Sequence, residues 1–495
     1  NFHYDLIGNR TSEIDPRGFE TQFAYTTRGQ LSSITQPDPV TGAAGVGPIT
    51  SFTYTARNLP LAITYPNLAK RQFTYDTSDN LLTDTDELGR KTTSTYDTLN
   101  RLTSTRLPDP NSVTGTAGPT TKIVYNPLGL VSQTVDLLGQ TTQYSYDPQR
   151  NWLLRVTSPD PDGTTGSDVA PVVNFTYDVG GRRLTQTDLL GAVTKWEYDA
   201  DSRVTRVTLP DPDGAGTDPA PHQTLDYDRA GRLIATTDPL GRTTRYAYDP
   251  LGRVVTETSP LGNLTRRTYD LVGNLVSQTL ADPDGSGPQT APVWAYTYDS
   301  LNRVSAQIDP RGNVTQAQYD ALGRMVAVTQ PDPDGGSGPQ AAPVWRWGYN
   351  SRGWVTSATD PLGFVTQYTL NDAGQVTGVT DPDPDGPGPL TSPTTSTVYD
   401  LLGRVKSVTD PAGTTSYTYN TASQLTGVTD PRLATTNYAY DFLGRLTKET
   451  GATPTSGGRA TSRPVTTYRY DSASRLISQT DPVLATTKWT RDKLG

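Results

Sequence analysis

The sequence predicts an all-β protein made of tandem β-hairpins, and one 21-residue stretch, residues 242–262, shows why. Two short runs, 242–248 and 253–258, alternate β-branched or aromatic residues with other residues, which is typical of strands. A four-residue turn follows each run, at 249–252 and 259–262, with Asp or Ser first, Pro second and Gly fourth. This order favours a type I turn. Variants of the stretch fill the chain, so we expect a long coiled antiparallel ribbon.

A Tyr that closes the first strand of each unit marks this repeat along the whole chain. Successive markers are mostly about 20 residues apart, whereas eight of the intervals are longer by roughly half. Leu370 and Arg491 stand in the Tyr place in two units. We therefore predict one continuous array over residues 1–495, with about 20 hairpin units and no separate domain. Both ends fall at the same phase of the repeat, which indicates a piece of a longer array.

The long intervals share one cause, a hydrophilic, Pro- and Gly-rich insert in place of the second turn. Insert-bearing hairpins follow groups of three, two and two units, which gives a higher-order period of about 173 residues. Because β-ribbons twist and coil, one such period would correspond to one turn of a coil. Duplication of a seven-hairpin block would produce the same period without geometric meaning, and both interpretations stay open. The inserts begin at Pro37, Pro108, Pro159, Pro210, Asp282, Pro331, Asp381 and Gly451.

The composition suits a wall that is one sheet thick rather than a solid core. Only 33% of residues are hydrophobic, and the 45 Gly and 40 Pro recur in phase with the Tyr residues, which argues against disorder. On the first strand, Thr244, Tyr246 and Tyr248 share one face, and Arg245 and Ala247 share the other. We predict that the Tyr residues stack as a ladder from hairpin to hairpin and that Arg side chains pack on them. Which face lies inside is left open.

The chain offers little to catalysis, and we predict a protein that is not an enzyme and needs no cofactor. It has no Cys and only two His, His3 and His222, and we place His222 in an insert loop. A Ser-His-Asp triad or a zinc site therefore has almost nothing to build on. The net charge is −9 without a basic block, which argues against nucleic-acid binding. No segment approaches the length of an apolar membrane span, so we expect no membrane insertion.

The insert carboxylates are the one chemical alternative that we keep. Alternating Asp residues have the spacing that opens a calcium loop, but the Glu that would complete an EF-hand loop is Ser392 here. Pro at the intervening positions favours a plain Asp-Pro turn instead. The weak calcium candidates are Asp381, Asp383, Asp385, Asp160, Asp162 and Asp168.

The motif Tyr-Asp-x-Leu-Gly-Arg-Leu-x-x-x-Thr-Asp-Pro-x-Gly resembles that of the YD-repeat, or Rhs (rearrangement hotspot), family. Residues 227–241 and 399–413 show it, and the resemblance extends over the whole chain. It implies a β-hairpin ribbon that spirals into a hollow shell. In bacterial Rhs proteins and Tc-toxin C components such a shell encloses a toxic C-terminal domain, and in teneurins a related shell serves cell adhesion. The positions that we expect to build the wall are Tyr248, Asp249, Gly252, Arg253, Tyr227, Asp228, Gly231, Arg232, Tyr399, Asp400, Gly403 and Arg404.

Three functional hypotheses follow from the repeat and the resemblance. The first is a structural, non-catalytic wall of a hollow tube or shell outside a bacterial cell, secreted or at the surface. The repeats run regularly to Gly495 without the divergent core segment of toxin-releasing members, which favours a tube. The second is a cocoon around a C-terminal toxin used in interbacterial competition. The third is a cell-surface adhesin or carbohydrate-binding surface. Expected partners are flanking repeats of the same chain, further copies in a filament, or an enclosed toxin domain.

Overall fold

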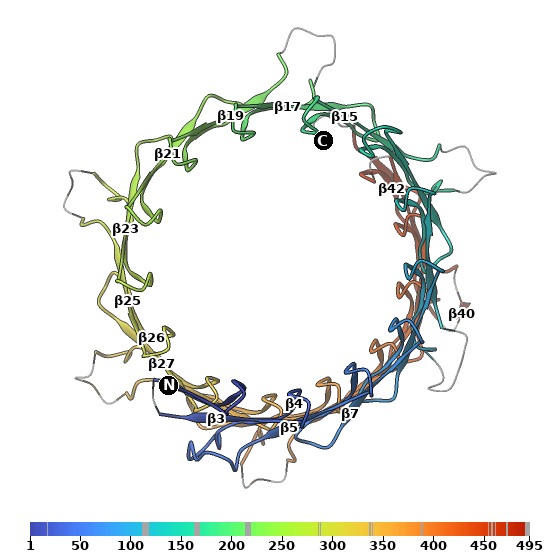
Figure 1. Cartoon of the computed structure of the whole chain (residues 1–495). Helices are drawn as coiled ribbons and strands as arrows, with labels where there is room; N and C mark the ends of the chain where they lie inside the picture. The colour runs from blue at the N-terminus through green and yellow to red at the C-terminus, as the bar shows by residue number, and fades with distance from the viewer. Residues whose placement is uncertain are drawn as a thin grey trace. The chain divides into compact units, whose positions relative to one another are not determined.

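In the computed structural model of the protein, the regular secondary structure of the described residues is entirely β-strand (Figure 1). Among its described residues no helix is long and apolar enough to cross a membrane. The structure describes residues 1–16, 18–110, 118–162, 169–212, 219–285, 287, 289–335, 338, 340–386, 388, 390–453, 455, 456, 459, 460, 462–471 and 474–490.

Each unit before the last contributes two strands, and the first one ends at the marker residue. The first strands are β1 (Phe2–Tyr4), β3 (Glu20–Tyr25), β5 (Ile49–Tyr54), β7 (Lys70–Tyr75), β9 (Lys91–Tyr96), β11 (Thr120–Tyr125), β13 (Thr141–Tyr146), β15 (Val172–Tyr177), β17 (Val193–Tyr198), β19 (His222–Tyr227), β21 (Thr243–Tyr248), β23 (Leu264–Tyr269), β25 (Val293–Tyr298), β27 (Val314–Tyr319), β29 (Val344–Tyr349), β31 (Val365–Leu370), β33 (Thr394–Tyr399), β35 (Gly413–Tyr419), β37 (Thr435–Tyr440), β41 (Val465–Tyr470) and β43 (Thr486–Lys488).

The second strands are slightly shorter and follow the corner. They are β2 (Arg10–Ile14), β4 (Leu31–Thr35), β6 (Pro60–Thr64), β8 (Leu81–Thr85), β10 (Leu102–Arg106), β12 (Val131–Val135), β14 (Leu153–Thr157), β16 (Arg183–Thr187), β18 (Val204–Thr208), β20 (Leu233–Thr237), β22 (Val254–Thr258), β24 (Leu275–Thr279), β26 (Val304–Ile308), β28 (Met325–Thr329), β30 (Val355–Thr359), β32 (Val376–Thr380), β34 (Val405–Asp410), β36 (Leu425–Thr429), β38 (Leu446–Thr450) and β42 (Leu476–Thr480). The short strands β39 (Thr455–Ser456) and β40 (Arg459–Ala460) pair with each other inside the last insert.

The predicted all-β hairpin ribbon is confirmed, because 41 strands form one antiparallel sheet. In the hairpin β21–β22, Arg245 faces Thr258 across the ladder and Ala247 faces Thr256. The register then shifts by one residue at Tyr248, which faces Val254. The next strand continues the ladder in the same way, as β20 does with β21. Strand bounds at this repeat differ from the predicted ones by a single residue.

The corner between β21 and β22 explains the register shift. The N–H of Gly252 donates to the carbonyl of Asp249 at 3.0 Å, and the N–H of Asp249 donates to the carbonyl of Arg253 at 2.9 Å. Gly252 has a φ of 82°, the left-handed conformation that glycine adopts without penalty. A tight turn followed by one left-handed residue is the hairpin connection that carries a G1 bulge. The predicted turn therefore becomes a turn plus a bulge.

The inserts replace the second turn, as predicted, and each closes at its base with the same hydrogen bond. The N–H of the residue after the second strand donates to the carbonyl of a Pro that directly precedes the next strand. At the first insert, the N–H of Gln36 lies 3.0 Å from the oxygen of Pro48. This bond extends the ladder by one rung before the chain leaves the sheet. The closing Pro residues are Pro48, Pro119, Pro171, Pro221, Pro292, Pro343, Pro393 and Pro464.

The sheet has no thick apolar core in the part of the chain that the structure describes. Its buried hydrophobic residues are three alanines, Ala192, Ala235 and Ala327, and no large side chain there is fully buried. On β21 the half-buried residues Thr244, Tyr246 and Tyr248 alternate with the exposed Arg245 and Ala247. The prediction of a wall one sheet thick is thus confirmed, and its stability comes from the ladder and the corners.

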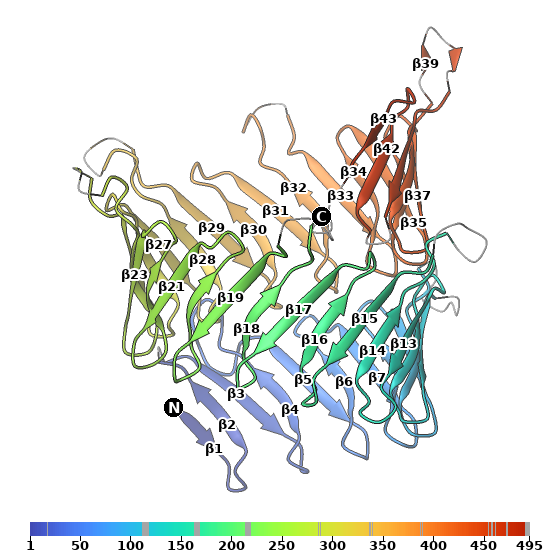
Figure 2. The same cartoon turned by 90° about the horizontal axis from the view of Figure 1, so that it is seen from above.

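The chain divides into two compact units. The first contains residues Asn1–Ser94, Pro108–Thr116 and Leu264–Gly413, and the second contains Thr95–Leu107, Ala117–Asn263 and Thr414–Gly495. In the first unit the early hairpins β3–β8 lie beside the late hairpins β29–β34 (Figure 2). In the second unit the insert after β14 lies beside the corner between β37 and β38. Each unit therefore joins ribbon segments that are far apart in sequence.

These contacts correct the interpretation of the insert period as one turn of a coil. The hydrogen bond between Asn67 and Asp372 joins positions 305 apart in the first unit. In the second unit the N–H of Phe442 donates to the carbonyl of Pro161 at 3.1 Å, across a similarly long stretch of sequence. Ribbon edges meet at separations well beyond the insert period because strand number and twist, not the spacing of inserts, determine where a ribbon meets itself. The insert period is therefore shorter than the sequence separation at which ribbon edges meet.

Candidate functional site

The Asp of each corner organises the turn that follows it. One carboxylate oxygen of Asp249 accepts from the N–H groups of Leu251 and Arg253, both at 2.9 Å. The other accepts from Nε of Arg253 at 2.6 Å. An Asp at the first turn position satisfies backbone donors that the ladder leaves unpaired. The Arg is therefore held by its own corner and extends along the edge of the sheet.

The Arg at this corner position also contacts the next hairpin, as Arg232 of the preceding corner shows. The guanidinium of Arg232 lies 4.8 Å from the ring centre of Tyr248, and its Nη1 donates to the carbonyl of Asp249 at 3.1 Å. The hydroxyl of Tyr248 donates to the carbonyl of Leu233 at 2.6 Å. A guanidinium that stacks on a ring and also bonds to a carbonyl uses both its flat face and its donors. The Asp228 corner is thus fastened to the Asp249 corner by Arg232 and Tyr248.

The other two predicted corners have the same geometry. The carboxylate of Asp228 accepts from Nε of Arg232 at 2.7 Å, and that of Asp400 accepts from Nε of Arg404 at 2.7 Å. Tyr227 donates to the carbonyl of Val204, and Tyr399 donates to that of Val376, both at 2.9 Å. Gly231 and Gly403 have φ values of 81° and 80°. The structure therefore places the predicted repeat residues together, corner by corner.

The corner Tyr rings do not stack on one another as predicted, because in the described residues they pack against Arg side chains. In the part of the chain that the structure describes, corner Tyr rings meet guanidinium groups, for example Arg303 at 4.1 Å from Tyr319 and Arg101 at 4.4 Å from Tyr125. The rings of Trp152 and Tyr177, which belong to consecutive hairpins, lie 5.4 Å apart, with Trp152 in the position that Arg232 holds in its own corner. The phenol of most corner Tyr residues donates to a carbonyl of the preceding hairpin, as Tyr125 does to Leu102 and Tyr319 to Val304. The Arg packing on Tyr is as predicted.

The corner hydrogen bonds shift the titration of the Asp residues. The backbone N–H of Arg253 is the largest influence that holds the pKa of the Asp249 carboxyl below 3.8, and the Arg253 guanidinium adds to it. The N–H and guanidinium of Arg232 lower the pKa of Asp228 in the same way. Hydrogen bonds to an ionised carboxylate favour its charged form. These carboxylates are structural anions at neutral pH.

Arg352 is the centre of the contact between ribbon segments in the first unit, which we call the Arg352 seam. Its guanidinium lies 4.0 Å from the ring centre of Tyr65 and 3.6 Å from a carboxylate oxygen of Glu87. Its Nη1 donates to the carbonyl of Asp372 at 2.9 Å, while the Asp372 carboxylate accepts from Asn67 at 2.7 Å. Burial, followed by hydrogen bonding to Glu87, raises the pKa of Tyr65. One corner thus holds two turns from a distant segment.

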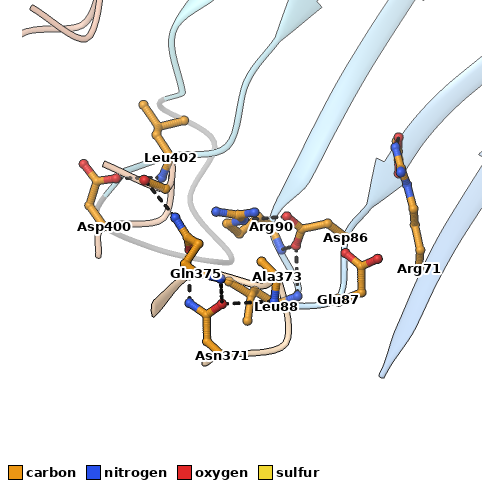
Figure 3. Close-up of polar contacts among 12 residues, drawn as sticks. Arg71, Asp86, Glu87, Leu88, Arg90, Asn371, Ala373, Gln375, Asp400 and Leu402 are labelled. Atoms are coloured by element: carbon orange, nitrogen blue, oxygen red, sulfur yellow. Dashed lines mark hydrogen bonds and ion pairs between the residues drawn. The ribbon is translucent and has the colours of Figure 1, made fainter. Parts of the chain in front are cut away.

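Further along the same seam, an Arg of the early segment lies against a corner of the late segment (Figure 3). Gln375 donates to the carbonyl of Gly403 at 2.8 Å, and Arg90, held by Asp86, lies against the same corner. A Cβ atom at position 403 would lie 3.0 Å from Nη1 of Arg90. Gly403 has a left-handed φ of 80°, which favours glycine, and a larger residue there would also require the Arg90 guanidinium to shift by a few tenths of an ångström.

A cavity of about 760 Å³ lies at the corresponding contact in the second unit. Its lining includes the described end of the insert at Pro161, the turn residues Asp188 and Leu189, and the corner residues Asp441 and Arg445. Asp441 pairs with Arg445 at 2.7 Å, and Arg445 donates to the carbonyl of Asp471 at 2.8 Å. Asp441 and Arg445 of the lining thus join neighbouring corners.

The insert carboxylates close their own loops. Asp383 accepts from the N–H of Asp385 at 3.2 Å, and Asp385 accepts from the N–H of Leu390 at 3.2 Å. Asp160 likewise accepts from the N–H of Asp162 at 3.4 Å. Over the described residues no group of three or more acidic or His side chains is placed to hold a metal ion. Asp381 continues the ladder through its own N–H, and Asp168 lies outside the described residues.

The two His residues are far apart in the chain and belong to different units. Nδ1 of His3 lies 3.0 Å from the hydroxyl of Ser12. His222 is exposed as predicted, but it is the first residue of β19 and not part of an insert loop. The correction arises because the Pro before it closes the insert one residue earlier than expected.

Sequence reasoning missed two groups of residues that hold the fold together. The seam residues Asn67, Glu87, Arg352 and Asp372 come from repeat positions that vary, and their partners lie on a distant segment of the chain, so no local pattern identifies them. The Pro residues that close the inserts had a visible signal. A Pro directly precedes the alternating run that follows each insert.

Comparison with known proteins agrees with this architecture. A family model described as RHS Repeat matches residues 75–111, 125–165, 227–264, 248–286, 298–335, 349–385 and 399–435. Together these ranges cover half of the chain. A search of curated proteins found no match.

Solved structures of toxin complexes have a similar fold. A complex of TcdB2, TccC3 and Cdc42 matches with a TM-score of 0.53 and 16% identity over 93% of this chain and 28% of that one. A Tc holotoxin pore from Photorhabdus luminescens matches with a TM-score of 0.54 and 16% identity over 99% of this chain and 27% of that one. The chain therefore spans about a quarter of the length of these structures.

Tandem hairpins, a Tyr-Asp corner in most units and Arg side chains that join one corner to the next define a β-ribbon repeat protein. The matched repeats make the assignment specific. The chain belongs to the RHS repeat family.

Proposed function

We propose that this chain is a wall segment of a hollow β-shell or tube and has no catalytic activity of its own. The observation that carries the proposal is the seam. Arg352 joins a corner to the turns at Tyr65 and Glu87. Ribbon segments are therefore held together by contacts between their edges as well as by the strand ladder. A sheet one layer thick with joined edges excludes large molecules without a core of its own.

The chemistry of the repeat supports a structural role. The recurrent Asp residues accept from backbone N–H groups of their own turn, and many of them, such as Asp249, also pair with an Arg. With no Cys and two distant His, the residue types of nucleophilic or transition-metal catalysis are scarce. We further propose that the wall works without a cofactor, because the insert carboxylates serve their own loops.

A low-resolution image of the purified chain tests this proposal. We expect a wall around a region of low density, seen in negative stain and as a hollow-body pair-distance distribution in solution scattering. A solid particle with the dimensions of a packed globular protein of 53.5 kDa would overturn it.

A toxin-enclosing cocoon is a second candidate, and the likeness to TccC3-containing complexes favours it. In that case the partners are flanking repeats and an enclosed domain, and the protein acts outside a bacterial cell, secreted or at its surface. The test is to fuse a protease-sensitive domain after Gly495 and to digest the fusion. Protection of the domain in the folded fusion, and its loss after the wall is unfolded, would support the cocoon. Equal digestion in both states would contradict it.

A further inference from the structure

A row of basic side chains crosses one face of the sheet in the second unit. It lies at the joints, the residue pairs that connect the second strand of one hairpin to the first strand of the next. Of the six joints from β10–β11 to β20–β21, five hold one Lys or Arg, and the sixth pairs Gln133 with Gln143. The members of this basic row are Lys122 opposite Ser104, Arg155 opposite Asn174, Lys195 opposite Thr185, Arg206 opposite Thr224, and Arg245 opposite Ala235.

The register of the strands places all five side chains on the same face. Residues directly opposite each other in an antiparallel pair share a face, and so do residues two apart on one strand. Lys195 lies opposite Thr208, which is two residues from Arg206 on β18. Equivalent steps link each member of the basic row to the next. Successive joints are two strands apart, which is about 10 Å.

The basic row is accessible and only partly compensated by acidic residues. Arg206 is half-buried, and its Nε lies 3.9 Å from a carboxylate oxygen of Glu197. The other four members are exposed, and in the part of the chain that the structure describes they form no ion pair. The acidic residues on this face of β11–β21 are Glu197 and Asp226. The row is therefore positive, although the whole chain has a net charge of −9.

The strand ladder does not require a cation at a joint. In the first unit most joints are uncharged. Ala62 lies opposite Gln72, for example, and Ser357 lies opposite Gln367, whereas Arg346 is an exception. Since the same ladder forms with Ala, Ser or Gln at these positions, the charges of the basic row are an addition to the fold and not a condition for it.

The spacing and surroundings of the row indicate the chemistry of its partner. Duplex DNA carries about one charge per 1.7 Å of helix axis, which is far denser than the cations of the row. Single-stranded nucleic acid stacks its bases on aromatic side chains, and none of the six joints holds an aromatic residue. A peptide strand adds to the edge of a sheet, where backbone groups are free, and not to its face.

The partners of the basic side chains across the joints are themselves hydrogen-bonding groups. Ser104, Thr185 and Thr224 offer hydroxyls, and Asn174 offers an amide. Hydroxyls and amides both donate and accept, as the hydroxyls of a sugar do. A surface that alternates widely spaced cations with such groups is complementary to a hydroxyl-rich polymer with widely spaced anions.

We propose that the basic row binds a linear acidic polysaccharide that carries a carboxylate on every second sugar. The polymer lies across the strands from β11 to β21. Two sugar units are close in length to the distance between successive joints, so each carboxylate comes within reach of one Lys or Arg, and the sugar hydroxyls bond to Ser, Thr and Asn. The inference goes beyond the proposed wall and depends on strand register alone.

The test is fluorescence anisotropy of a labelled hyaluronate oligosaccharide, which has this pattern of carboxylates, titrated with the 495-residue chain. We expect saturable binding at low ionic strength that weakens as added salt screens the charges. The row variant Lys122→Gln/Lys195→Gln/Arg245→Gln should bind about tenfold or more weakly, because affinity of this kind follows the number of cations that contact the anions. Neutral dextran of similar length should not bind.

The matched control is Lys70→Gln/Lys91→Gln/Arg311→Gln. It removes the same charge at exposed residues of the first unit, outside the basic row, and should bind hyaluronate as the unchanged chain does. Far-ultraviolet circular dichroism establishes that both variants retain their β-structure.

Four outcomes would overturn this inference. They are no saturable binding of hyaluronate at low salt, equal affinities of the row variant and the control variant, equal binding of neutral dextran, and tighter binding of duplex DNA that the row variant loses. The last outcome would assign the row to nucleic acid. A hollow wall that does not bind hyaluronate would remove this inference and leave the proposed function intact. A solid particle that binds hyaluronate through the row would do the reverse.

Discussion

The hydroxyl of Tyr248 donates a 2.6 Å hydrogen bond to the carbonyl of Leu233, which belongs to the preceding hairpin. The guanidinium of Arg232 stacks on the same ring. Two side chains therefore reinforce the joint between hairpins where the strand ladder ends, at the corner. Because the sheet has almost no buried core, these joints account for much of what resists fraying along its edge.

Replacing Tyr248 by Phe should weaken this joint locally. The ring and its contact with Arg232 remain, but the carbonyl of Leu233 loses its partner, which costs about 1 kcal/mol. Amide hydrogen exchange across β20–β22 measures the effect, since a repeat array opens unit by unit. Tyr246→Phe on the same strand is the control and should change exchange less. Equal effects of the two substitutions would contradict the role of the corner hydroxyl.

Gly252 should tolerate Asn better than Val. Its φ of 82° is left-handed, where a β-branched residue costs about 1–2 kcal/mol. The chain itself places Asn at the equivalent positions 58, 100 and 302, with φ of 69°, 61° and 61°. We expect faster hydrogen exchange at the corner in Gly252→Val than in Gly252→Asn. If both variants exchange alike, backbone conformation is not what selects Gly here.

Acid should destabilise the ribbon through its corner Asp residues. Hydrogen bonds hold the pKa of Asp249 and that of Asp228 below 3.8, so the folded state binds these protons less readily than the unfolded state does. Their stabilising contribution is therefore complete above pH 3.8 and disappears as the pH falls through the lowered pKa values. A circular dichroism titration should show unfolding only below that pH.

Asp249→Asn separates charge from turn geometry in this titration. The chain already uses Asn350 at a corner, where its side-chain oxygen accepts from the N–H of Trp354 at 3.1 Å. An Asn at 249 keeps that acceptor but loses the ion pair with Arg253. We expect a slightly weaker corner at pH 7 whose hydrogen exchange no longer depends on acid. An unchanged acid response at this corner would contradict the assignment.

Replacing Arg352 by Ala should open the Arg352 seam without unfolding the hairpins. The substitution removes the contacts with Tyr65, Glu87 and the carbonyl of Asp372 together. Because the chain has no Cys, the variant pair Asn67→Cys/Asp372→Cys can be joined by a short bismaleimide, with each single Cys variant as the control for links between chains. We expect rapid linking with Arg352 present and slower linking in Arg352→Ala. Equal rates would show that the seam does not depend on this residue.

Removing calcium should leave thermal stability unchanged. Asp383 and Asp385 accept hydrogen bonds from backbone N–H groups of their own loop, which is the function of an Asp-Pro turn. Calcium needs six to eight oxygen ligands, and the paired oxygens would have to leave these donors to bind it. We expect equal melting temperatures in a chelator and in millimolar calcium. A higher melting temperature in calcium would establish the ion as a ligand.

The local structure could be predicted because the strands and turns of a unit depend on residues within that same unit. Alternation located the strands β21 and β22 within one residue, and Asp249 and Gly252 identified the corner. The partner of the Tyr ring could not be predicted. Spacing alone placed Tyr next to Tyr, whereas the extended phenol reaches a carbonyl and leaves its face to Arg232.

The sequence by itself determined the hairpins, their corners, the positions of the inserts and the absence of a thick core, since all of these depend on neighbours close in the chain. Only the tertiary structure decided which edges meet. The contacts of Arg352 with Tyr65 and Glu87 join segments that are far apart in sequence, and the twist accumulated over many hairpins determines that register. A small change of twist in each unit would bring other residues opposite Arg352, so no single repeat contains the information that places the seam.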